Sequence, residues 1–312
     1  MNTEKISSFP TPIQKLGNLQ NNFVYVKRED FIPFSFGGNK ARKAKFFFRE
    51  ILNGKYTDVV TYGSSSSNHC RIISNLAVSY GIPCYIISPE EASEPTFNSY
   101  MMECFGADIV VVPTESVSSK IEEILNSLRV KGRNPYFIAG GGHGNLGTEA
   151  YVECYNEICD FEKTYGESFD YIFHASGTGT TQAGLICGKI INKDNKRIIG
   201  ISIARKKERG RKVVLDSVRE YLISKNTDIN ETVLEEETVF EDSYIGEGYG
   251  FLNSASVIEK MLIEYGMPLD GTYTGKAFMG MLDYLASNNI KGKKILFIHT
   301  GGTPLFFDFL KK

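Results

Sequence analysis

The segment Ala175-Ser176-Gly177-Thr178-Gly179-Thr180-Thr181-Gln182-Ala183-Gly184 decides how the rest of the chain is interpreted. It follows an apolar run at 171–174 that is typical of a buried strand, and it leads into a helical pattern that continues to residue 191. A turn rich in glycine and threonine between a strand and a helix offers free backbone N–H groups to a phosphate. The turn matches neither G-x-G-x-x-G nor G-x-x-x-x-G-K-S/T, so it favours a single phosphate over a dinucleotide or a nucleoside triphosphate.

Short apolar runs alternate with helical patterns on both sides of this segment. The runs predict strands at residues 58–62, 84–88, 108–113, 136–139, 171–174, 197–204 and 294–299. The helical patterns predict helices at residues 40–52, 68–80, 96–105, 117–130, 146–164, 181–191, 211–223, 254–265 and 275–288. This alternation predicts an α/β fold with open, doubly wound parallel sheets, whose ligands bind beyond the carboxyl ends of the strands.

The composition is that of an ordinary globular protein. The chain has 312 residues, 42% of them hydrophobic and 23% charged, which is enough for about two domains of the usual size. The 35 basic and 37 acidic side chains leave a net charge of −2, which argues against nucleic acid or an anionic membrane surface as the main partner. No apolar run approaches the ~20 residues of a spanning helix, and the first residues lack the apolar part of a signal peptide. We therefore expect a soluble, cytoplasmic protein.

The six cysteines and four histidines are too scattered to predict a metal site or disulfide bonds. None of the cysteines forms C-x-x-C, and Cys154 and Cys159 have a spacing that is poor for a shared metal ion. We expect buried free thiols for most of them, and no metal.

A second segment, Gly37-Gly38-Asn39-Lys40-Ala41-Arg42-Lys43, opens a predicted helix. Asn39 can cap the helix that begins at Lys40, and the two glycines permit a tight turn before it. Three basic residues in the first turn oppose the helix macrodipole, which favours acidic residues there. Because residues that break a local rule are often functional, we consider a special role for Lys40 beside the alternative of a solvated basic turn.

Two more turns follow predicted strands. The segment Gly63-Ser64-Ser65-Ser66-Ser67-Asn68-His69 offers hydroxyl and N–H groups to phosphate or carboxylate, although ordinary helix capping explains it equally well. The glycines of Ala139-Gly140-Gly141-Gly142-His143-Gly144-Asn145 permit close approach to a ligand or simply a tight bend. A lysine at a helix start, a turn for one phosphate and a second anion-binding turn together suggest pyridoxal 5′-phosphate, which carries one phosphate and an aldehyde that bonds an amine.

Seven motifs follow one another along nearly the whole chain. They are Pro10-Thr11-Pro12-Ile13, Val26-Lys27-Arg28-Glu29-Asp30, Gly37-Gly38-Asn39-Lys40-Ala41-Arg42-Lys43, Ser67-Asn68-His69, Thr178-Gly179-Thr180-Thr181-Gln182-Ala183-Gly184, Tyr273-Thr274-Gly275-Lys276 and His299-Thr300-Gly301-Gly302-Thr303-Pro304. In this order they resemble the D-cysteine desulfhydrase / 1-aminocyclopropane-1-carboxylate deaminase family of fold-type II pyridoxal-phosphate enzymes. The resemblance implies two doubly wound, open, twisted sheets, with a small domain inserted in a larger cofactor domain.

The resemblance also implies the residues of the site. Lys40 would bond the aldehyde as a Schiff base and act as a base once the substrate has displaced it. The cofactor would be bound by Lys40, by Asn68 at its 3′ oxygen, by Thr300 at its pyridine nitrogen, and by Gly177, Thr178, Gly179, Thr180 and Thr181 at its phosphate. The substrate would be bound by Ser67, Asn68 and His69 at its carboxylate, and by Tyr249, Tyr273 and Thr274. Ser67, Tyr249 and Tyr273 would join Lys40 as catalytic residues, although each tyrosine alone could equally be a core residue with a satisfied hydroxyl group.

Two positions separate the branches of this family. Ring-opening deaminases typically have Glu after the tyrosine and Leu in the His-Leu-Gly-Gly motif, where this chain has Thr274 and Thr300. We therefore expect β-elimination on a cysteine-like amino acid, foremost D-cysteine, giving pyruvate, hydrogen sulfide and ammonia. The alternatives are a 1-aminocyclopropane-1-carboxylate deaminase, another lyase or β-replacement enzyme for a different amino acid, and a non-catalytic protein that binds pyridoxal phosphate.

The chain departs from the family pattern at Ser66, where Gln is common, and at His143 in an unusual Gly-His-Gly; both could border the substrate. We expect a large pyridoxal-phosphate-binding domain of residues 1–54 and 155–312, and a small domain of residues 55–154, with the site between them. By resemblance the partners would be a small amino-acid substrate and a second copy in a homodimer, with neither nucleic acid nor membrane.

Overall fold

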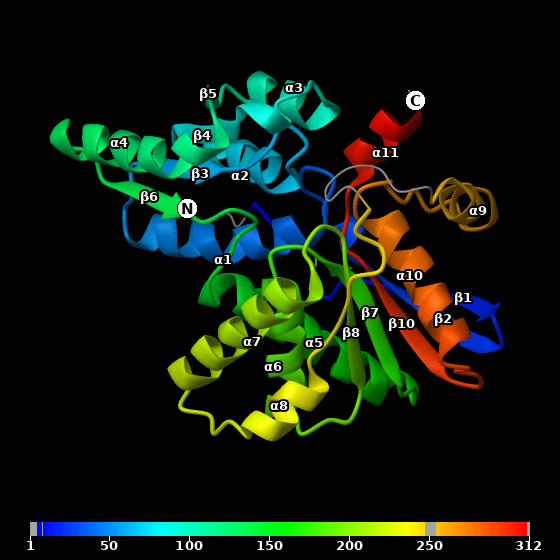
Figure 1. The fold of residues 1–312 in the computed structure, drawn as a ribbon. Coiled ribbons are helices and arrows are strands. Elements are labelled where there is room, and N and C mark those ends of the chain that lie inside the picture. Colours follow the sequence, from blue (N-terminus) through cyan, green and yellow to red (C-terminus); the bar gives the residue numbers. More distant parts are fainter. Residues whose placement is uncertain (1–4, 8, 247–253, 311–312) are drawn as a thin grey trace.

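The computed structural model describes residues 5–7, 9–246 and 254–310, and its strands form two sheets (Figure 1). The six-stranded sheet has the order β1-β2-β10-β7-β8-β9, with β1 at Ile13–Leu19, β2 at Asn22–Arg28, β10 at Lys294–His299, β7 at Tyr171–Ser176, β8 at Arg197–Ser202 and β9 at Val239–Glu241. The four-stranded sheet has the order β5-β4-β3-β6, with β5 at Asp108–Val112, β4 at Cys84–Pro89, β3 at Asp58–Tyr62 and β6 at Pro135–Ile138. In the described part of the chain β1 and β2 pair antiparallel and every other pair is parallel.

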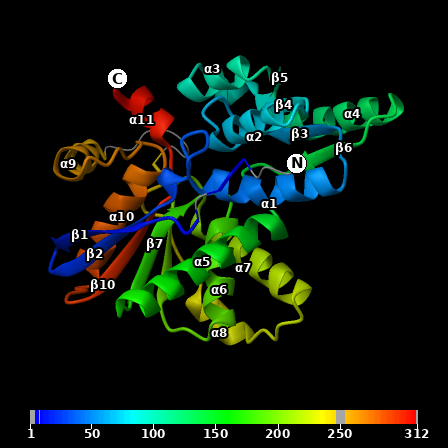
Figure 2. The ribbon, with the colours of Figure 1, turned by 180° about the vertical axis from the view of Figure 1, so that it is seen from behind.

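Helices cover both faces of each sheet (Figure 2). Their bounds are α1 Asn39–Asn53, α2 Asn68–Ser79, α3 Phe97–Cys104, α4 Val117–Val130, α5 Asn145–Tyr165, α6 Thr180–Ile191, α7 Lys207–Ser224, α8 Glu231–Glu237, α9 Ala255–Tyr265, α10 Thr274–Ser287 and α11 Thr303–Leu310. Two parallel-rich sheets with helices on both faces confirm the fold class that the sequence predicts.

Each parallel strand supplies two cores, because successive side chains of a strand point to opposite faces. Along β10, Ile295 and Phe297 pack with α9 and α10, whereas Leu296 and Ile298 pack with α5, α6 and α7. In the smaller sheet Val59 of β3 packs with α1 and α2, and its neighbour Val60 packs with α4.

Helix α1 runs between the two sheets (Figures 1 and 2). Its Phe46 joins the core beside α5 and the six-stranded sheet, while Phe48 and Ile51 join the core of the four-stranded sheet. A helix that serves both cores has its first turn fixed relative to both sheets. The predicted domain boundaries fall just after α1 and within α5, and they stay a prediction.

Most predicted elements are present, and the differences have local causes. The strand predicted at 197–204 ends at Ser202, because the Ser202 hydroxyl accepts a hydrogen bond from the Arg205 N–H and donates one to the Arg205 carbonyl, which closes a turn. Strands β1, β2 and β9 and helices α8 and α11 were not predicted. In β2 the reason is a charged end: Lys27 and Arg28 are buried, so the strand lacks an apolar signature.

A buried cluster of charges fixes α1 against its neighbours. Arg42 on α1 donates to Glu29 at 2.5 Å and to Glu157 on α5 at 2.8 Å, and Lys27 on β2 donates to Glu157 at 2.6 Å. The Lys27, Glu29 and Arg42 side chains are fully buried. Burial alone would raise the pKa of Glu29, but Arg42 and Lys27 outweigh it and hold that pKa at about 2, below the ordinary 4.5.

The variant Glu29→Gln is expected to lower the free energy of unfolding by about 3–5 kcal/mol near neutral pH, because it leaves Arg42 and Lys27 buried with one carboxylate fewer. A carboxyl group with a lowered pKa stabilises the folded state above its unfolded pKa of 4.5 and loses that contribution as pH falls towards 2. The difference between wild type and variant, measured by urea unfolding, should therefore shrink by about 3 kcal/mol over this interval. Glu123→Gln, which breaks an exposed ion pair with Lys120, is the control and should change stability little at any pH. A difference for Glu29→Gln that does not depend on pH would contradict this account.

The C-terminal helix α11 joins the two sheets a second time. It follows β10 of the six-stranded sheet and lies beside α3, which packs in the core of the four-stranded sheet (Figures 1 and 2). Both carboxylate oxygens of Asp308 accept a hydrogen bond from the Phe97 N–H at 3.2 Å, and the Phe97 and Phe307 rings meet edge to face. Thr96, one residue earlier, donates to the Ser65 carbonyl at 2.8 Å. The α3 start therefore connects α11 to the serine-rich turn.

Candidate active site

Lys40 lies in the first turn of α1, where two glycine-containing segments cross. The Asn39 N–H donates to the Thr300 carbonyl at 3.0 Å. Gly38 has a φ of +93°, and a Cβ at this position would lie 2.5 Å from the Thr300 oxygen. Only glycine fits such a crossing, so the motifs around Lys40 and Thr300 are brought together by close backbone contact.

The Lys40 amine donates to the Gly141 carbonyl at 3.0 Å, which places it beside the glycine-rich turn before α5. Burial and the nearby Arg205 guanidinium lower the pKa of Lys40 from 10.5 to about 8, although the Cys70 thiol opposes this. An amine with this pKa is largely neutral in mildly basic solution, and the neutral amine is the form that attacks an aldehyde.

This pKa predicts how the Lys40 amine reacts in the cofactor-free protein. We expect its rate of acylation to reach half of its maximum near pH 8, because half of the amine is neutral there. The rate is measured by mass spectrometry of the peptide that contains Lys40, from about pH 6 to about pH 11. Lys40→Ala removes the amine, so the mass signal that disappears in this variant is the one that belongs to acylated Lys40. A midpoint near the ordinary 10.5 would contradict the buried position of the amine.

The turn between β7 and α6 lies next to this amine. The Thr180 hydroxyl accepts a hydrogen bond from Lys43 at 2.7 Å, and the Thr181 hydroxyl accepts one from the Asn39 side chain at 3.1 Å. A Cβ at Gly141 would lie 2.6 Å from the Thr178 side chain, so the turn before α5 packs directly on the turn before α6. The N-termini of α1 and α6, with their free N–H groups, therefore converge.

Three cations surround this convergence without carboxylate partners. Lys40, Lys43 and Arg205 form no ion pair with any residue in the described ranges. Arg205 donates to the Thr178 carbonyl at 3.4 Å, and burial together with Lys40 lowers the pKa of Lys43 well below its ordinary value. Uncompensated cations beside helix N-termini suit a bound anion with more than one negative charge, such as a phosphate monoester.

The serine-rich turn ends at the N-terminus of α2. Ser67 caps this helix by accepting a hydrogen bond from the Cys70 N–H at 3.1 Å. The backbone N–H groups of Asn68 and His69 donate to no described residue, and they face the side of the helix where anions bind. The influence of Lys40 on the pKa of both His69 and Cys70 shows that this turn is close to the Lys40 amine.

The His69 ring is directed into the four-stranded sheet. Its Nε2 lies 2.9 Å from the Thr61 hydroxyl, which donates its only proton to the Ile138 carbonyl, so Nε2 carries a proton. Burial, helped by Lys40 and Lys43, lowers the pKa of His69 well below its ordinary value, and the ring is neutral. Because the ring is directed away from the turn, the backbone N–H of His69 is the group that could bind the substrate carboxylate, and this role stays a prediction.

Tyr273 and Thr274 begin α10, and a buried carboxylate holds them there. Asp270 accepts hydrogen bonds from the N–H groups of Thr272, Tyr273 and Thr274 at 2.8–3.0 Å, and from the Thr274 hydroxyl at 2.7 Å. A Cβ at Gly302 would lie 2.5 Å from Asp270, which ties this helix start to the Thr300 motif. Thr274 is fully buried, so its effect on a substrate would act through the position of Tyr273. Tyr249 lies outside the described residues.

Several residues of the site were not predicted from the sequence. Lys43 is one helical turn from Lys40 on the same face, and this spacing could have identified it. Arg205 directly follows a predicted strand, at the edge of the sheet where ligands bind. Asp270 precedes a motif that we did quote, whereas the role of the Gly141 carbonyl leaves no trace in the sequence. Of the two departures, His143 is half-buried beside Thr178, and Ser66 lies in the serine-rich turn.

Another buried lysine, Lys276 on α10, is a competitor for the role of Lys40. Its amine donates to the Ile203 and Ile245 carbonyls at 3.3 and 3.1 Å. Burial lowers its pKa to about 8, against the opposing effect of Asp270. Lys40 differs from Lys276 because it lies next to the turn before α6 and to the other two cations.

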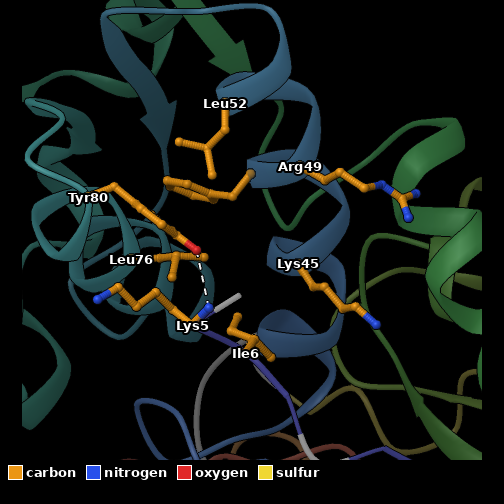
Figure 3. Close-up of a pocket in the computed structure, with 8 residues that line it drawn as sticks. Lys5, Ile6, Lys45, Arg49, Leu52, Leu76 and Tyr80 are labelled. Atoms are coloured by element: carbon orange, nitrogen blue, oxygen red, sulfur yellow. Dashed lines mark hydrogen bonds between the residues drawn. The ribbon is translucent and has the colours of Figure 1, made fainter. Parts of the chain in front are cut away.

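Two other features lie apart from this site. A cavity of about 190 Å³ is lined by Lys5, Ile6, Lys45, Phe48, Arg49, Leu52, Leu76 and Tyr80, and the Lys5 N–H donates to the Tyr80 hydroxyl (Figure 3). None of the predicted site residues lines it. Cys159, Glu162 and Asp194 could together hold a metal ion, but Lys196 is paired with both carboxylates. No helix in the described ranges is long and apolar enough to cross a membrane.

Comparisons with known proteins agree with this geometry. The chain is 29% identical to the D-cysteine desulfhydrase of Yersinia enterocolitica, covering 98% of this chain and 97% of that one. It is 33% identical to a putative 1-aminocyclopropane-1-carboxylate deaminase of Pyrococcus horikoshii, covering 96% and 91%. The crystal structure of an ACC deaminase homologue, 31% identical, superposes with a TM-score of 0.86 over 96% of this chain and 92% of that one. A hydrogen sulfide-producing enzyme of Fusobacterium nucleatum, at 18% identity and a TM-score of 0.64 over 94% and 95%, shares the fold.

The family model that matches is described as a pyridoxal-phosphate-dependent enzyme, and it spans residues 6–301. That range contains Lys40, the turn before α6 and Thr300. The chain therefore belongs to the family of pyridoxal-phosphate-dependent enzymes, and pyridoxal 5′-phosphate is its cofactor.

Proposed function

We propose that the protein is a lyase that removes the β-substituent of a small, cysteine-like amino acid, with D-cysteine as the foremost substrate. The products are pyruvate, hydrogen sulfide and ammonia. The observation that carries the proposal is the position of the Lys40 amine, which has a pKa of about 8 and lies beside a turn with two further unpaired cations.

The residues of the site fit the cofactor. Lys43, Arg205 and the N–H groups of the turn before α6 supply the charge and the donors that its phosphate requires. We assign Lys40 to bond its aldehyde and Thr300 to face its pyridine nitrogen; in support, the Thr300 carbonyl accepts a hydrogen bond from the Asn39 N–H in the first turn of α1. When bound, pyridoxal phosphate supplies an aldehyde for the amine of the substrate and a ring that accepts electrons from the substrate's Cα.

The residues of the chain then perform two tasks. The free N–H groups of Asn68 and His69 hold the substrate carboxylate. The Lys40 amine, once released, takes the proton from Cα. The Cβ–S bond breaks, and the sulfur leaves with the bonding electron pair as hydrosulfide, which becomes hydrogen sulfide by taking up the proton that Lys40 removed from Cα. The remaining three-carbon amino acid reacts with water to give pyruvate and ammonia, which balances the reaction.

The choice of elimination is supported by Thr300. A threonine is neutral, so it stabilises a protonated pyridine nitrogen less than a carboxylate would. A ring that is less protonated holds electrons from Cα for a shorter time, which favours loss of a β-substituent over transfer of the amino group. Thr300 is also where this chain departs from the pattern of the ring-opening deaminases.

The alternative is a 1-aminocyclopropane-1-carboxylate deaminase, and it is favoured by the Pyrococcus relative and the ACC deaminase homologue. Relatives under both names are about equally similar to this chain, so overall identity does not separate the two reactions. We place D-cysteine first because of Thr274 and Thr300, and we further propose that the enzyme acts as a homodimer.

The test is a substrate panel with the purified protein and added pyridoxal phosphate. Pyruvate and sulfide are measured with D-cysteine, L-cysteine, D-serine and β-chloroalanine, and the 2-oxo acid formed is measured with 1-aminocyclopropane-1-carboxylate. Sulfide and pyruvate from D-cysteine, with no 2-oxo acid from the cyclopropane, support the proposal. Activity only on the cyclopropane would assign the alternative. If no product forms from any substrate of the panel although the cofactor is bound, both D-cysteine and 1-aminocyclopropane-1-carboxylate are rejected as substrates.

A further inference from the structure

The side chain of Asn68, which we propose to contact the cofactor's ring oxygen, is held by two buried residues that no motif predicted. Asn98 on α3 and Arg71 on α2 are both fully buried. The Asn98 side-chain nitrogen donates to the Asn68 side-chain oxygen at 3.1 Å, and Arg71 donates to the same oxygen at 3.3 Å. The Asn68 side-chain nitrogen donates to no described residue.

The orientation of these amides follows from their partners. The Asn98 nitrogen also donates to the Ser66 carbonyl at 2.8 Å, and a carbonyl oxygen can only accept. The Asn98 nitrogen, and not its oxygen, therefore points towards Ser66 and Asn68. Its hydrogen bond to Asn68 needs an acceptor atom, which is the Asn68 side-chain oxygen. Arg71, which can only donate, makes the same demand independently. Both demands fix the Asn68 oxygen towards the protein and leave its nitrogen as the free donor.

The arrangement leaves polar atoms buried without partners. The Asn98 side-chain oxygen and the Arg71 Nε have no hydrogen-bond partner among the described residues. A buried polar atom without a partner destabilises the folded state, because its hydrogen bonds to water are not replaced, and an apolar side chain in the same space would avoid this. The two polar residues therefore lower the stability of the folded state. What they provide in return is a set of hydrogen bonds to Asn68 and its neighbours.

Arg71 also brings a charge to this amide. It forms no ion pair with a described carboxylate, and burial lowers its pKa to about 9. Its other partners are the carbonyl and hydroxyl of Ser35, a residue with a φ of +47° in the loop that leads to Lys40. A hydrogen bond from a cation to the amide oxygen polarises the amide and makes its N–H groups stronger donors.

We propose that Arg71 and Asn98 are positioning residues that hold the Asn68 amide with its nitrogen ready to donate to the negatively charged ring oxygen of the cofactor. The inference rests on the proposed function and on the position at the cofactor's 3′ oxygen, the ring oxygen, that the family resemblance implies for Asn68. Donation to the ring oxygen lowers its affinity for the proton that it shares with the nitrogen of Lys40 in the loaded enzyme. Loss of the hydrogen bonds from Arg71 and Asn98 to Asn68 therefore raises the pH at which that proton is released.

The experiment is a pH titration of the visible absorption of the protein-bound cofactor, in the wild type and three variants. Asn98→Asp keeps the size of the side chain but offers only acceptors, so it favours the turned Asn68 amide, with the oxygen towards the cofactor, against the opposing demand of Arg71. We expect its midpoint to rise by about one pH unit, tenfold in proton affinity, as for loss of one hydrogen bond to a charged oxygen. Asn98→Leu, which adds no charge, is expected to shift the midpoint in the same direction but less, because Arg71 remains.

Thr96→Val is the matched control. It removes the hydrogen bond from the α3 start to the serine-rich turn and the Thr96 cap on the Ser99 N–H, but it leaves both partners of Asn68 in place. We expect it to lower the thermal midpoint without moving the pH midpoint. Wild-type pH midpoints in both Asn98 variants, or an equal shift in Thr96→Val, would overturn the inference. If Asn98→Asp fails to fold, the pH midpoint of Asn98→Leu decides whether the inference holds.

The outcomes also separate this inference from the proposed function. A wild-type protein that shows no cofactor band after loading, or no turnover, contradicts the proposed function itself. A wild-type protein with a band and turnover, beside Asn98 variants with unmoved midpoints, contradicts only the role of Arg71 and Asn98.

Discussion

Lys40→Ala is expected to abolish turnover, with a loss of about 10³-fold or more. The variant lacks the amine that we propose bonds the cofactor's aldehyde and, with it, the base that takes the Cα proton. Its fold should be retained, because Lys40 makes one hydrogen bond and no ion pair with described residues, and burial of its charge is unfavourable. The measurements are product formation with the best substrate of the panel and the visible absorption of the bound cofactor.

The matched control for this variant is on the same helix. Lys45→Ala removes a lysine that pairs with Glu153 at 3.5 Å, away from the site, and should change turnover less than about twofold. Retained turnover in Lys40→Ala, together with an unchanged absorption band, would refute the role that we give to Lys40.

Gly38→Ala is expected to lower stability and to weaken cofactor binding more than tenfold. A Cβ at this position lies 2.5 Å from the Thr300 carbonyl oxygen and 3.0 Å from the Gly301 Cα, so α1 has to move away from the Thr300 segment. The positive φ of +93° adds backbone strain of about 1–2 kcal/mol. We expect the free energy of unfolding to fall by about 3 kcal/mol or more, measured by urea unfolding, with cofactor affinity measured by titration of the cofactor-free protein.

A second glycine separates backbone strain from the steric clash. Gly81 also has a positive φ, +69°, but a Cβ there meets nothing within 4 Å. Gly81→Ala should therefore cost about 1 kcal/mol and leave cofactor affinity unchanged. Equal effects of the two variants would show that the crossing of the two segments does not position Lys40.

The sequence predicts the strands and turns that form the sheet edges, because a buried parallel strand is a short apolar run and a ligand-binding turn is rich in glycine. Strands β3 and β10 match their predicted bounds for this reason. The edge strand β1 is only partly buried, and β2 ends in Lys27 and Arg28; the buried charge of Lys27 is neutralised by Glu157, which is distant in sequence. No local pattern reports such long-range pairing.

The site shows the same limit. The motifs give the positions of Lys40, Ser67 and the turn before α6, but they do not give the direction of a side chain. The His69 ring is directed at Thr61 in the sheet and the Thr274 hydroxyl at Asp270, while the unpredicted Lys43 and Arg205 lie at the turn. Orientation depends on partners brought in by the fold, as the hold of Arg71 and Asn98 on Asn68 illustrates.

The central claim, that Lys40 is the residue that bonds the cofactor, is tested most directly by reduction of the loaded protein with borohydride and mass mapping of its peptides. Reduction converts a Schiff base to a stable secondary amine, so the cofactor stays on the lysine that held it. We expect one modified peptide, with the cofactor's mass on Lys40. The cofactor on another buried lysine, such as Lys43 or Lys276, or on no lysine, would contradict the account.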